Sequence, residues 1–572
     1  MIMQYAYAVF ELIAGLGAFL LGVKLLSDNM EKLATDKLRR LFHKASGQTD
    51  IPAGATRKEK LRAKLKEFSG NLAGVGIGTV TTAVIQSSSL TTVMVVGLVN
   101  VGVMTLYQAT GLIMGANIGT TITAQIAALQ AFNLSAFATG LTGIGVLVAM
   151  FSKKEKVQTV SYAAAGLGLV FIGLEMMSDS MSFFRESEAV VALFSGITNP
   201  FLLFFLGLAI TAIVQSSSAV TSILISMATA GIMIGEGGND VFYVVLGTNI
   251  GTCVTALISA LGANINAKRA AVIHLLFNCI GSLIFFVVLI CWPNMAAVTF
   301  EKWFPGYPST QIAMFHTFFN VICTVLFLPF SKGFVKLSSV LVREKKKRAE
   351  QLEEADETLL DKRLLATPSL AVENATDETV QTLAEAAHSL KDAVEGFLEQ
   401  DGSRADSVRQ LNAKVSESTQ KIGDYLVKIS AYEATLELEK RITALHSCLG
   451  DINRISELAD NVTKYTRRSL KDGLHFSPKV KEEIKDMLGV LEEMSAKTGK
   501  VLMEKNVPLL GEIDEFENKV DQKRKSLIKD HIHRLGSGEC RPESSGVFIN
   551  LVCNLERVGD HLNYIAHAVE AY

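Results

Sequence analysis

Several common features are scarce in this 572-residue sequence, and each absence excludes a class of protein. Charge is nearly balanced, at −2 formally, so nucleic acid is not expected as a partner. The 7 cysteines include no Cys-x-x-Cys pair, so we expect neither a disulfide framework nor a zinc site. Walker A, Gly-x-Ser-x-Gly and His-Glu-x-x-His motifs are missing, and therefore we expect that the protein is not an enzyme.

Apolar residues, by contrast, are abundant, and the mean hydropathy of +0.31 is too high for an ordinary soluble protein. Long apolar runs fill residues 1–335, whereas the remainder is charged and has helical periodicity. We expect an all-α membrane protein with a transmembrane domain over 1–335, a basic and then acidic linker over 336–367, and a helical domain over 368–572. The run Tyr5–Leu26 can span a bilayer and lacks a basic leader and a cleavage site, so we expect a retained first helix.

Three segments recur in the same order, which predicts an internal duplication over about residues 5–151 and 158–335. The first is a Gly-Leu-Gly segment with a further glycine, at 15–22 and 166–173. The second is Gln-Ser-Ser-Ser, at 86–89 and 215–218. The third is Gly-Ala-Asn-Ile-Gly-Thr-Thr at 115–121, which returns as Gly-Thr-Asn-Ile-Gly-Thr-Cys at 247–253.

Basic residues indicate how these repeats cross the membrane. The segment Lys32–Lys66 holds eleven Lys and Arg residues, which favours the cytoplasm for this segment and the outside for the N-terminus. We expect re-entrant helical hairpins at about 71–104, entered from the cytoplasm, and at about 200–234, entered from outside. Three full crossings per repeat then make the two repeats inverted, as in transporters that work by alternating access. The helical domain at 368–572 follows a cytoplasmic helix end, so we expect it in the cytoplasm.

The Gln-Ser-Ser-Ser segments are polar within apolar surroundings, and their chemistry suits ions. A helix end inside the membrane exposes free backbone N–H groups and a partial positive charge, which bind an anion. Hydroxyl, Gln and Asn oxygens are hard ligands suited to sodium. Ser and Gly are also common in plain helix packing, but duplication with an Asn-Ile-Gly-Thr segment about thirty residues later argues against that simpler interpretation.

These paired motifs resemble the type II sodium/phosphate cotransporter family over nearly all of residues 10–335. The resemblance implies cotransport of inorganic phosphate across a bacterial inner membrane with sodium as the coupling ion. Cys253 stands where the first repeat has Thr121, so a hydroxyl role does not carry over there. The alternatives are a transporter of another small oxyanion, an anion channel, and a regulatory adaptor; a homo-oligomer is compatible with all of these. The resemblance implies that the phosphate and sodium site is formed by Gln86, Ser87, Ser88, Ser89, Asn117, Thr120, Thr121, Gln215, Ser216, Ser217, Ser218, Asn249 and Thr252.

A smaller internal echo pairs His274 with Asn278 and His316 with Asn320. Buried imidazoles could relay protons or pair with a carboxylate. Such His and Asn pairs more commonly bridge helices by hydrogen bonds, and we assign them this structural role.

Two segments of the C-terminal region, 533–540 and 554–561, are similar to the PhoU family of helical phosphate-regulatory proteins. The weaker partner of the second is Asp451–Glu457, where Asn453 replaces the first acid. Glu556 and Asp560 lie at i and i+4 on one helix face, and the resemblance implies a divalent metal or iron bound there through oxygen ligands. The alternative is a solvated acidic face paired with neighbouring arginines.

Overall fold

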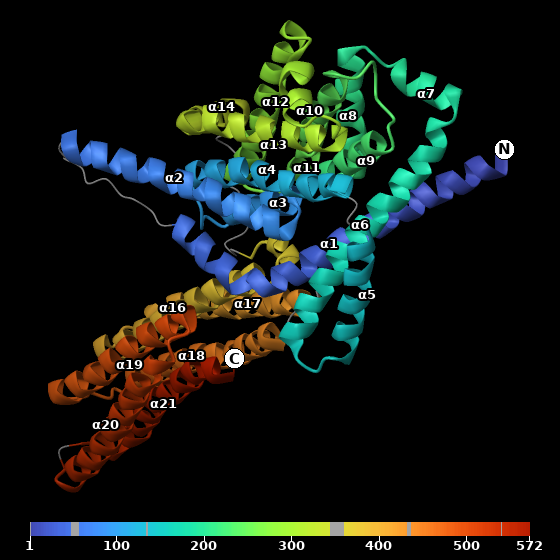
Figure 1. Cartoon of the computed structure of the whole chain (residues 1–572). Coiled ribbons are helices and arrows are strands. Elements are labelled where there is room, and N and C mark those ends of the chain that lie inside the picture. The colour runs from blue at the N-terminus through green and yellow to red at the C-terminus, as the bar shows by residue number, and fades with distance from the viewer. Residues whose placement is uncertain are drawn as a thin grey trace. The chain divides into compact units, whose positions relative to one another are not determined.

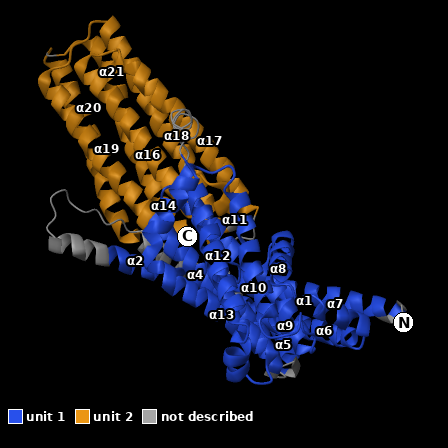
Figure 2. Cartoon of the chain, turned by 90° about the horizontal axis from the view of Figure 1, so that it is seen from above, with its two compact units in different colours: residues 1–349 blue, residues 350–572 orange. Residues whose placement is uncertain are grey.

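The computed structural model describes residues 2–46, 57–132, 135–343, 360–431, 436–538 and 540–571. The chain divides into two compact units, residues 1–349 and 350–572 (Figure 2). Helices make up both units, and no strand occurs among the described residues, so the predicted all-α fold is confirmed.

Unit 1 contains long apolar helices interrupted by short ones (Figure 1). The first half holds α1 (Ile2–Ser46), α2 (Arg57–Ile85), α3 (Ser88–Asn100), α4 (Leu106–Ala128) and α5 (Ser135–Phe151). The second half holds α6 (Glu155–Arg185), α7 (Glu188–Ser195), α8 (Pro200–Val214), α9 (Ser217–Thr229), α10 (Asp240–Gly251), α11 (Cys253–Ser259), α12 (Ile265–Cys291), α13 (Pro308–Phe327) and α14 (Ser331–Leu341).

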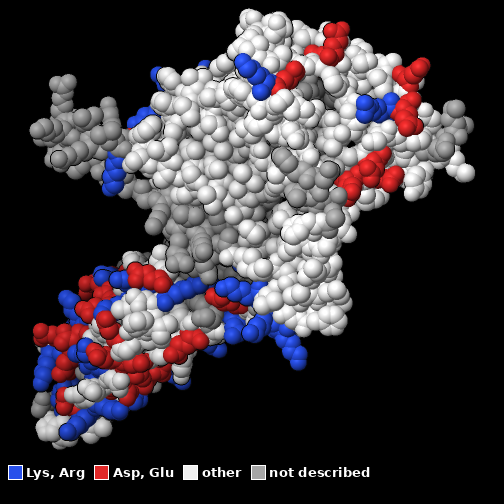
Figure 3. Space-filling model, viewed as in Figure 1, with Lys and Arg blue, Asp and Glu red and all other residues white. Residues whose placement is uncertain are grey.

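The surface of unit 1 is that of a membrane protein. Seven described helices are long and apolar enough to cross a bilayer, or eight if α7 and α8, which meet at 104°, form one span. Large apolar side chains face outward, among them Phe10, Phe137 and Ile213, which is 82% exposed. Few charged residues interrupt the visible face of this unit (Figure 3). Such an exposed apolar surface is stable against lipid but not against water, so the chain is a multi-pass membrane protein.

Helices α1 and α6 pack backbone to backbone through the glycines of the first repeated segment. Gly15 faces Gly173, and Gly22 faces Gly166. A Cβ atom added at any of these four positions would lie under 3.0 Å from main-chain atoms of the other helix. Residue numbers rise along α1 as they fall along α6, so the two helices run antiparallel.

Glycines also join the helix that precedes each Gln-Ser-Ser-Ser segment to the helix that carries the following Asn-Ile-Gly-Thr segment, here in parallel. In the first half, Gly115 and Gly119 of α4 lie against the Val75 and Thr79 carbonyls of α2. In the second half, Gly247 and Gly251 of α10 lie against the Phe204 and Leu208 carbonyls of α8. Because the numbering offset is constant within each pair, α2 runs parallel to α4 and α8 runs parallel to α10.

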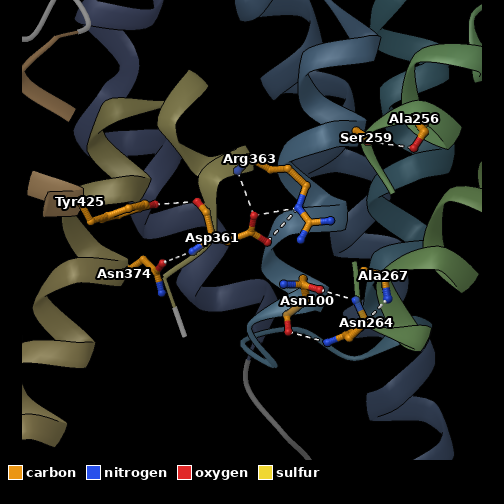
Figure 4. Close-up of polar contacts among 9 residues, drawn as sticks. All are labelled: Asn100, Ala256, Ser259, Asn264, Ala267, Asp361, Arg363, Asn374 and Tyr425. Carbon is orange, nitrogen blue, oxygen red and sulfur yellow. Dashed lines mark hydrogen bonds and ion pairs between the residues drawn. The ribbon is translucent and has the colours of Figure 1, made fainter. Parts of the chain in front are cut away.

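Two hydrogen bonds donated by Asn264 to Asn100 join the start of α12 to the end of α3. The Asn264 N–H donates to Asn100 Oδ1 at 2.8 Å, and Asn264 Nδ2 donates to the Asn100 carbonyl at 2.6 Å (Figure 4). Asn264 Oδ1 also accepts from the Ala267 N–H at 2.9 Å and so caps α12. The first half of unit 1 is therefore tied to the second half at this helix start.

In the described part of unit 2, six α-helices form a bundle and share one apolar core, which includes Leu390, Ile452, Leu491 and Phe548. A short segment precedes the bundle: Asp361 accepts a hydrogen bond from Tyr425 Oη at its carbonyl, and its N–H donates to Asn374 Oδ1 (Figure 4). The helices are α16 (Pro368–Glu399), α17 (Arg404–Ser430), α18 (Leu436–Lys471), α19 (Pro478–Glu504), α20 (Leu510–Gly536) and α21 (Pro542–His567).

Candidate functional site

Both Gln-Ser-Ser-Ser segments break a helix in the same way. Gln86 ends α2 and Gln215 ends α8, and both glutamines have left-handed backbones with φ of 55° and 58°. Ser87 and Ser216 then adopt extended backbones and cap α3 and α9. A left-handed residue other than glycine is strained, and such strain gathers at functional sites. Its presence at equivalent positions of both repeats marks these breaks as the candidate site.

The serines at each break present a helix N-terminus. Ser87 Oγ accepts from the Leu90 N–H, and Ser216 Oγ accepts from the Ala219 N–H, both at 3.2 Å. These two hydroxyls therefore serve first as helix caps. The backbone N–H groups of the following serines begin their helices and have no acceptor within them, so they are the donors available to an anion. Ser88 and Ser217 are both buried, at 6% and 5% exposure.

The predicted residues of α4 and α10 have the opposite hydrogen-bonding character. Asn117 Nδ2 donates to the Ile113 carbonyl and Asn249 Nδ2 donates to the Val245 carbonyl, both at 2.8 Å. The hydroxyls of Thr120, Thr121 and Thr252 likewise donate to carbonyls of their own chain segments. Because these side chains donate their hydrogen bonds to backbone carbonyls, their oxygen atoms keep lone pairs that are free to bind a cation.

The two glutamines differ in their surroundings. Gln86 is buried, donates to the Ala83 carbonyl, and accepts at Oε1 from Thr123 Oγ1 of α4 at 2.7 Å. Gln215 is exposed. The hydrogen bonds found among the described residues join the first segment to α4 but do not join the two Gln-Ser-Ser-Ser segments to each other. Helix α4 packs against both α3 and α9 and so lies between the two segments.

Three threonines at these breaks were missed. Thr92 and Thr221 are fully buried, and the described residues provide no partner for either hydroxyl. Their signal was present in the sequence, because the shared motif extends to Gln-Ser-Ser-Ser-x-x-Thr in both repeats. Thr123, the partner of Gln86, has no comparable signal and required the structure.

The predicted bridging role of the histidines is wrong for their rings. Neither ring nitrogen of His274 or His316 has a hydrogen-bond partner within the described part of the chain. Asn278 and Asn320 donate to the His274 and His316 carbonyls at 3.0 and 2.9 Å, which are bonds within their own helices. The sequence spacing of four residues produces these local bonds, and they leave the imidazoles without partners. Asn320 Nδ2 also lies 3.5 Å from Asn249 Oδ1 of α10, so the asparagine of this pair does bridge two helices.

In unit 2, the predicted pair Glu556 and Asp560 of α21 faces a second pair with the same spacing on α20, Glu517 and Asp521. Burial first, and then the neighbouring Asp560 carboxylate, raise the pKa of Glu556. Burial and nearby carboxylates likewise raise the pKa of Glu517. The pair on α20 was missed, although its i, i+4 acids were visible in the sequence.

This acidic group does not fit a metal ion well. Arg524 Nη2 donates to Asp521 Oδ1 at 2.9 Å, and Arg524 Nη1 lies 3.4 Å from Glu556 Oε1. Lys525 Nζ donates to Asp521 Oδ2 at 2.7 Å, and this hydrogen bond lowers the pKa of Asp521. Across the described ranges, no three His, Cys, Asp or Glu side chains converge as metal ligands, so the predicted metal receives no support.

Comparison with known proteins places this sequence in a family. The sequence model of the Na+/Pi-cotransporter family matches residues 53–179 and 173–298, and that of the PhoU domain matches 380–466 and 484–569. "Uncharacterized protein YqeW" of Bacillus subtilis is 30% identical over 273 residues, covering 47% of this chain and 84% of that protein. "Putative inorganic phosphate export protein YjbB" of Escherichia coli K12 is 26% identical over 391 residues, 68% of each chain.

Unit 2 has relatives of its own. "Phosphate-specific transport system accessory protein PhoU homolog 1" of Thermotoga maritima is 25% identical over 182 residues, which is 32% of this chain and 78% of that protein. The crystal structure of PhoU from Pseudomonas aeruginosa superposes with a TM-score of 0.32 at 18% identity, covering 34% of this chain and 94% of that one. Taken together, the sequence matches show that the chain belongs to the Na+/Pi-cotransporter family and carries a C-terminal PhoU domain.

Proposed function

We propose that this protein is a secondary transporter that moves inorganic phosphate together with sodium by alternating access, and that it is not an enzyme. The observation that carries the proposal is the paired helix break at Gln86 and Gln215, with the same strained backbone in both repeats. The N-termini of α3 and α9 supply N–H donors for phosphate, and the oxygens of Asn117, Asn249 and the α4 and α10 threonines supply ligands for sodium.

Inverted repeats are supported by the α1 and α6 contact. Gly15 and Gly166 are equivalent in sequence, as are Gly22 and Gly173. In the structure Gly15 meets Gly173, which is the equivalent of Gly22. Gly22 in turn meets Gly166, which is the equivalent of Gly15. A two-fold axis between antiparallel equivalent helices produces this exchange. An axis of this kind in the membrane plane is the arrangement of inverted repeats.

The unequal burial of the two glutamines supports alternating access. Gln86 is buried and bonded to α4, whereas Gln215 is exposed. A transporter with two equivalent hairpins holds one closed and one open at any moment, and exchanges them during the cycle. We therefore propose that the first segment is closed and the second open in this conformation.

We place the N-terminus outside and the PhoU domain in the cytoplasm, where it regulates transport rather than performing it. One relative is named for phosphate export. A coupled carrier moves its substrates in whichever direction the combined gradients favour, so that name and a sodium-coupled cycle are compatible.

The test is uptake of labelled phosphate into proteoliposomes under sodium, potassium, lithium and proton gradients. We expect accumulation only with an inward sodium gradient. Equal accumulation in potassium would contradict sodium coupling, and passive equilibration without accumulation would favour the channel. Competition by sulfate and arsenate at equal concentration identifies the oxyanion, and displacement of phosphate by sulfate would contradict the cargo.

A matched pair of variants tests the site. Ser88→Ala and Ser217→Ala keep the backbone N–H but lose a hydroxyl, so we expect a higher phosphate or sodium concentration for half-maximal uptake with normal membrane insertion. Ser69, a serine near the start of the apolar part of α2 that donates to the Lys66 carbonyl, is the control position. Unchanged kinetics in both variants would refute the assignment of these hydroxyls.

A further inference from the structure

Two equivalent serines contact the two helix breaks differently. Ser27 of α1 and Ser178 of α6 each begin a Ser-Asp-x-Met sequence at the same place in the two repeats. Ser27 Oγ donates to the carbonyl of Ile85, the last residue of α2, directly before the first Gln-Ser-Ser-Ser segment. Ser178 Oγ instead donates to the Ser226 carbonyl of α9, at 3.3 Å. One serine therefore reaches the helix break of its own repeat, and its equivalent does not.

The carbonyl that Ser27 contacts is one that a broken helix leaves without a donor. Carbonyls in the last turn of a helix have no N–H four residues later to bond, so another group must satisfy them. Ile85 is 1% exposed, and the Ser27 hydroxyl supplies the donor from a neighbouring helix. Ser27 thus fixes the end of α2 against α1, directly before the left-handed Gln86.

The equivalent carbonyl in the second repeat is uncovered. Val214 ends α8 and matches Ile85 in sequence, yet it is 47% exposed. Among the described residues, nothing donates a hydrogen bond to the Val214 carbonyl. The Ser226 carbonyl, by contrast, already accepts from the Ala230 N–H at 2.9 Å, so it does not need the Ser178 hydroxyl. In this conformation Ser178 satisfies no open helix end.

The two pairs of helices around these breaks therefore meet α1 and α6 at different heights. We call α2 with α3 the first hairpin and α8 with α9 the second hairpin. Ser226 is the tenth residue of α9, so the second break lies about 14 Å along the helix axis from the carbonyl that Ser178 contacts. The first break lies directly at Ser27. Gln130 Nε2 donates to Ser178 Oγ at 2.9 Å and holds it in this second position.

We propose that Ser27 and Ser178 are matched positioning residues, each of which holds its own hairpin closed by bonding the carbonyl directly before the Gln-Ser-Ser-Ser segment. Ser27 does so in this conformation. In the opposite conformation Ser178 bonds the Val214 carbonyl, and Ser27 leaves the Ile85 carbonyl. This serine switch rests on the proposed alternating access, because it names contacts that distinguish the two states.

Cross-linking of cysteine pairs in the full-length protein tests the contact between Ser178 and α8. Ser178→Cys with Val214→Cys is the test pair, and Ser27→Cys with Ile85→Cys is the reference pair, whose contact is present in this conformation. We expect mild oxidation to form a disulfide in both pairs, located by peptide mass spectrometry. Each disulfide should stop phosphate uptake until a reductant breaks it. A reference pair that links while the test pair does not would overturn the inference.

Ser180 supplies the matched control. It is a buried serine of α6, as Ser178 is, but its hydroxyl donates to the Ala8 carbonyl of α1 and not to a hairpin. Ser180→Cys with Val214→Cys should therefore stay unlinked. A control pair that links as readily as the test pair would show that the thiols meet without a specific approach of Ser178, and would overturn the serine switch.

Hydrogen exchange is the second measurement, for the case in which the cysteine pairs do not fold or do not link. We expect Ser27→Ala to speed backbone exchange of residues 85–89 about fivefold, because the closed first hairpin loses one hydrogen bond, and to slow exchange of residues 214–218. Ser178→Ala should have the reverse effects, and Ser180→Ala should leave the ratio of the two rates unchanged. Changes of the same sign in both segments, or no change in either, would overturn the inference.

Phosphate uptake by the same variants separates the serine switch from the proposed function. Opposite exchange effects in a protein that does not accumulate phosphate under a sodium gradient would support the switch and refute the proposed cotransport. Normal sodium-driven uptake by Ser27→Ala and Ser178→Ala, with hydrogen exchange equal to the wild type, would overturn the switch and leave the cotransport standing.

Discussion

At the scale of single residues, the left-handed glutamines mark the two helix breaks at which backbone groups and side chains take different roles in the candidate site. The repeated polar segments located both helix breaks, because a polar run within an apolar helix is conspicuous. Their left-handed backbone could not be predicted, since glutamine rarely adopts positive φ and only the surrounding packing imposes it. The division of roles, N–H donors at the serines and oxygens at the asparagines, also required the observed hydrogen bonds.

Substitutions at Gln86 distinguish these contributions. Gln86→Gly relieves the left-handed strain, whereas Gln86→Ala keeps it at a cost of about 1 kcal/mol. Both lose the hydrogen bond from Thr123. We expect weaker phosphate uptake in both and a higher unfolding temperature for the glycine variant. An alanine variant as stable as the glycine variant would show that the left-handed backbone is unstrained.

His567 gives the PhoU domain a pH-dependent contact. Hydrogen bonds to Glu570 and then to Asp514, both at 2.9 Å, raise the pKa of His567 above its usual value. The stability contributed by the imidazolium is therefore complete below about pH 6.5 and is lost as the pH rises through the raised folded-state pKa. After discounting for solvent, the contribution is about 0.5 kcal/mol.

Hydrogen exchange of α21 in the full-length protein measures this contact. We expect His567→Gln to exchange about twofold faster than wild type at pH 6, and equally at pH 9 after correction for intrinsic rates. Glu570→Gln removes one partner and should show a smaller change of the same sign. A difference that grows with pH would contradict the assigned sign.

At the scale of elements, glycine contacts decide which helices pack together. The apolar run Tyr5–Leu26 predicted a membrane helix, and this run lies within α1 (Ile2–Ser46). Packing partners could not be predicted in the same way, because contact through glycine leaves no complementary side-chain pattern on the opposite helix.

The α1 and α6 crossing can be tested with one pair of substitutions. Gly173→Leu would place a side chain into the Gly15 and Phe19 backbone, where even a Cβ lies under 3.0 Å from three atoms. We expect a loss of about 3 kcal/mol of stability. Gly17→Leu is the control, because a Cβ there meets nothing within 4 Å. Thermal unfolding in detergent measures both, and equal midpoints would contradict the close crossing.

At the scale of the whole molecule, the two units have different compositions and separate cores, which the sequence made visible as a change from apolar to charged residues. Removing residues 350–572 leaves every proposed transport residue in place. We expect the shortened protein to retain sodium-dependent phosphate uptake and to lose the regulation of that uptake by the PhoU domain. Loss of uptake by a correctly inserted protein would show instead that the PhoU domain takes part in transport.

The glycine exchange between α1 and α6 also has a historical consequence. A half-length ancestor carrying one copy of this surface could have formed a homodimer, since the patch is complementary to itself in antiparallel orientation. Gene fusion would then have preserved an interface that already existed. We expect residues 1–154 produced alone in a membrane to form dimers, detectable by chemical cross-linking of the inserted fragment; a strictly monomeric fragment would argue against this origin.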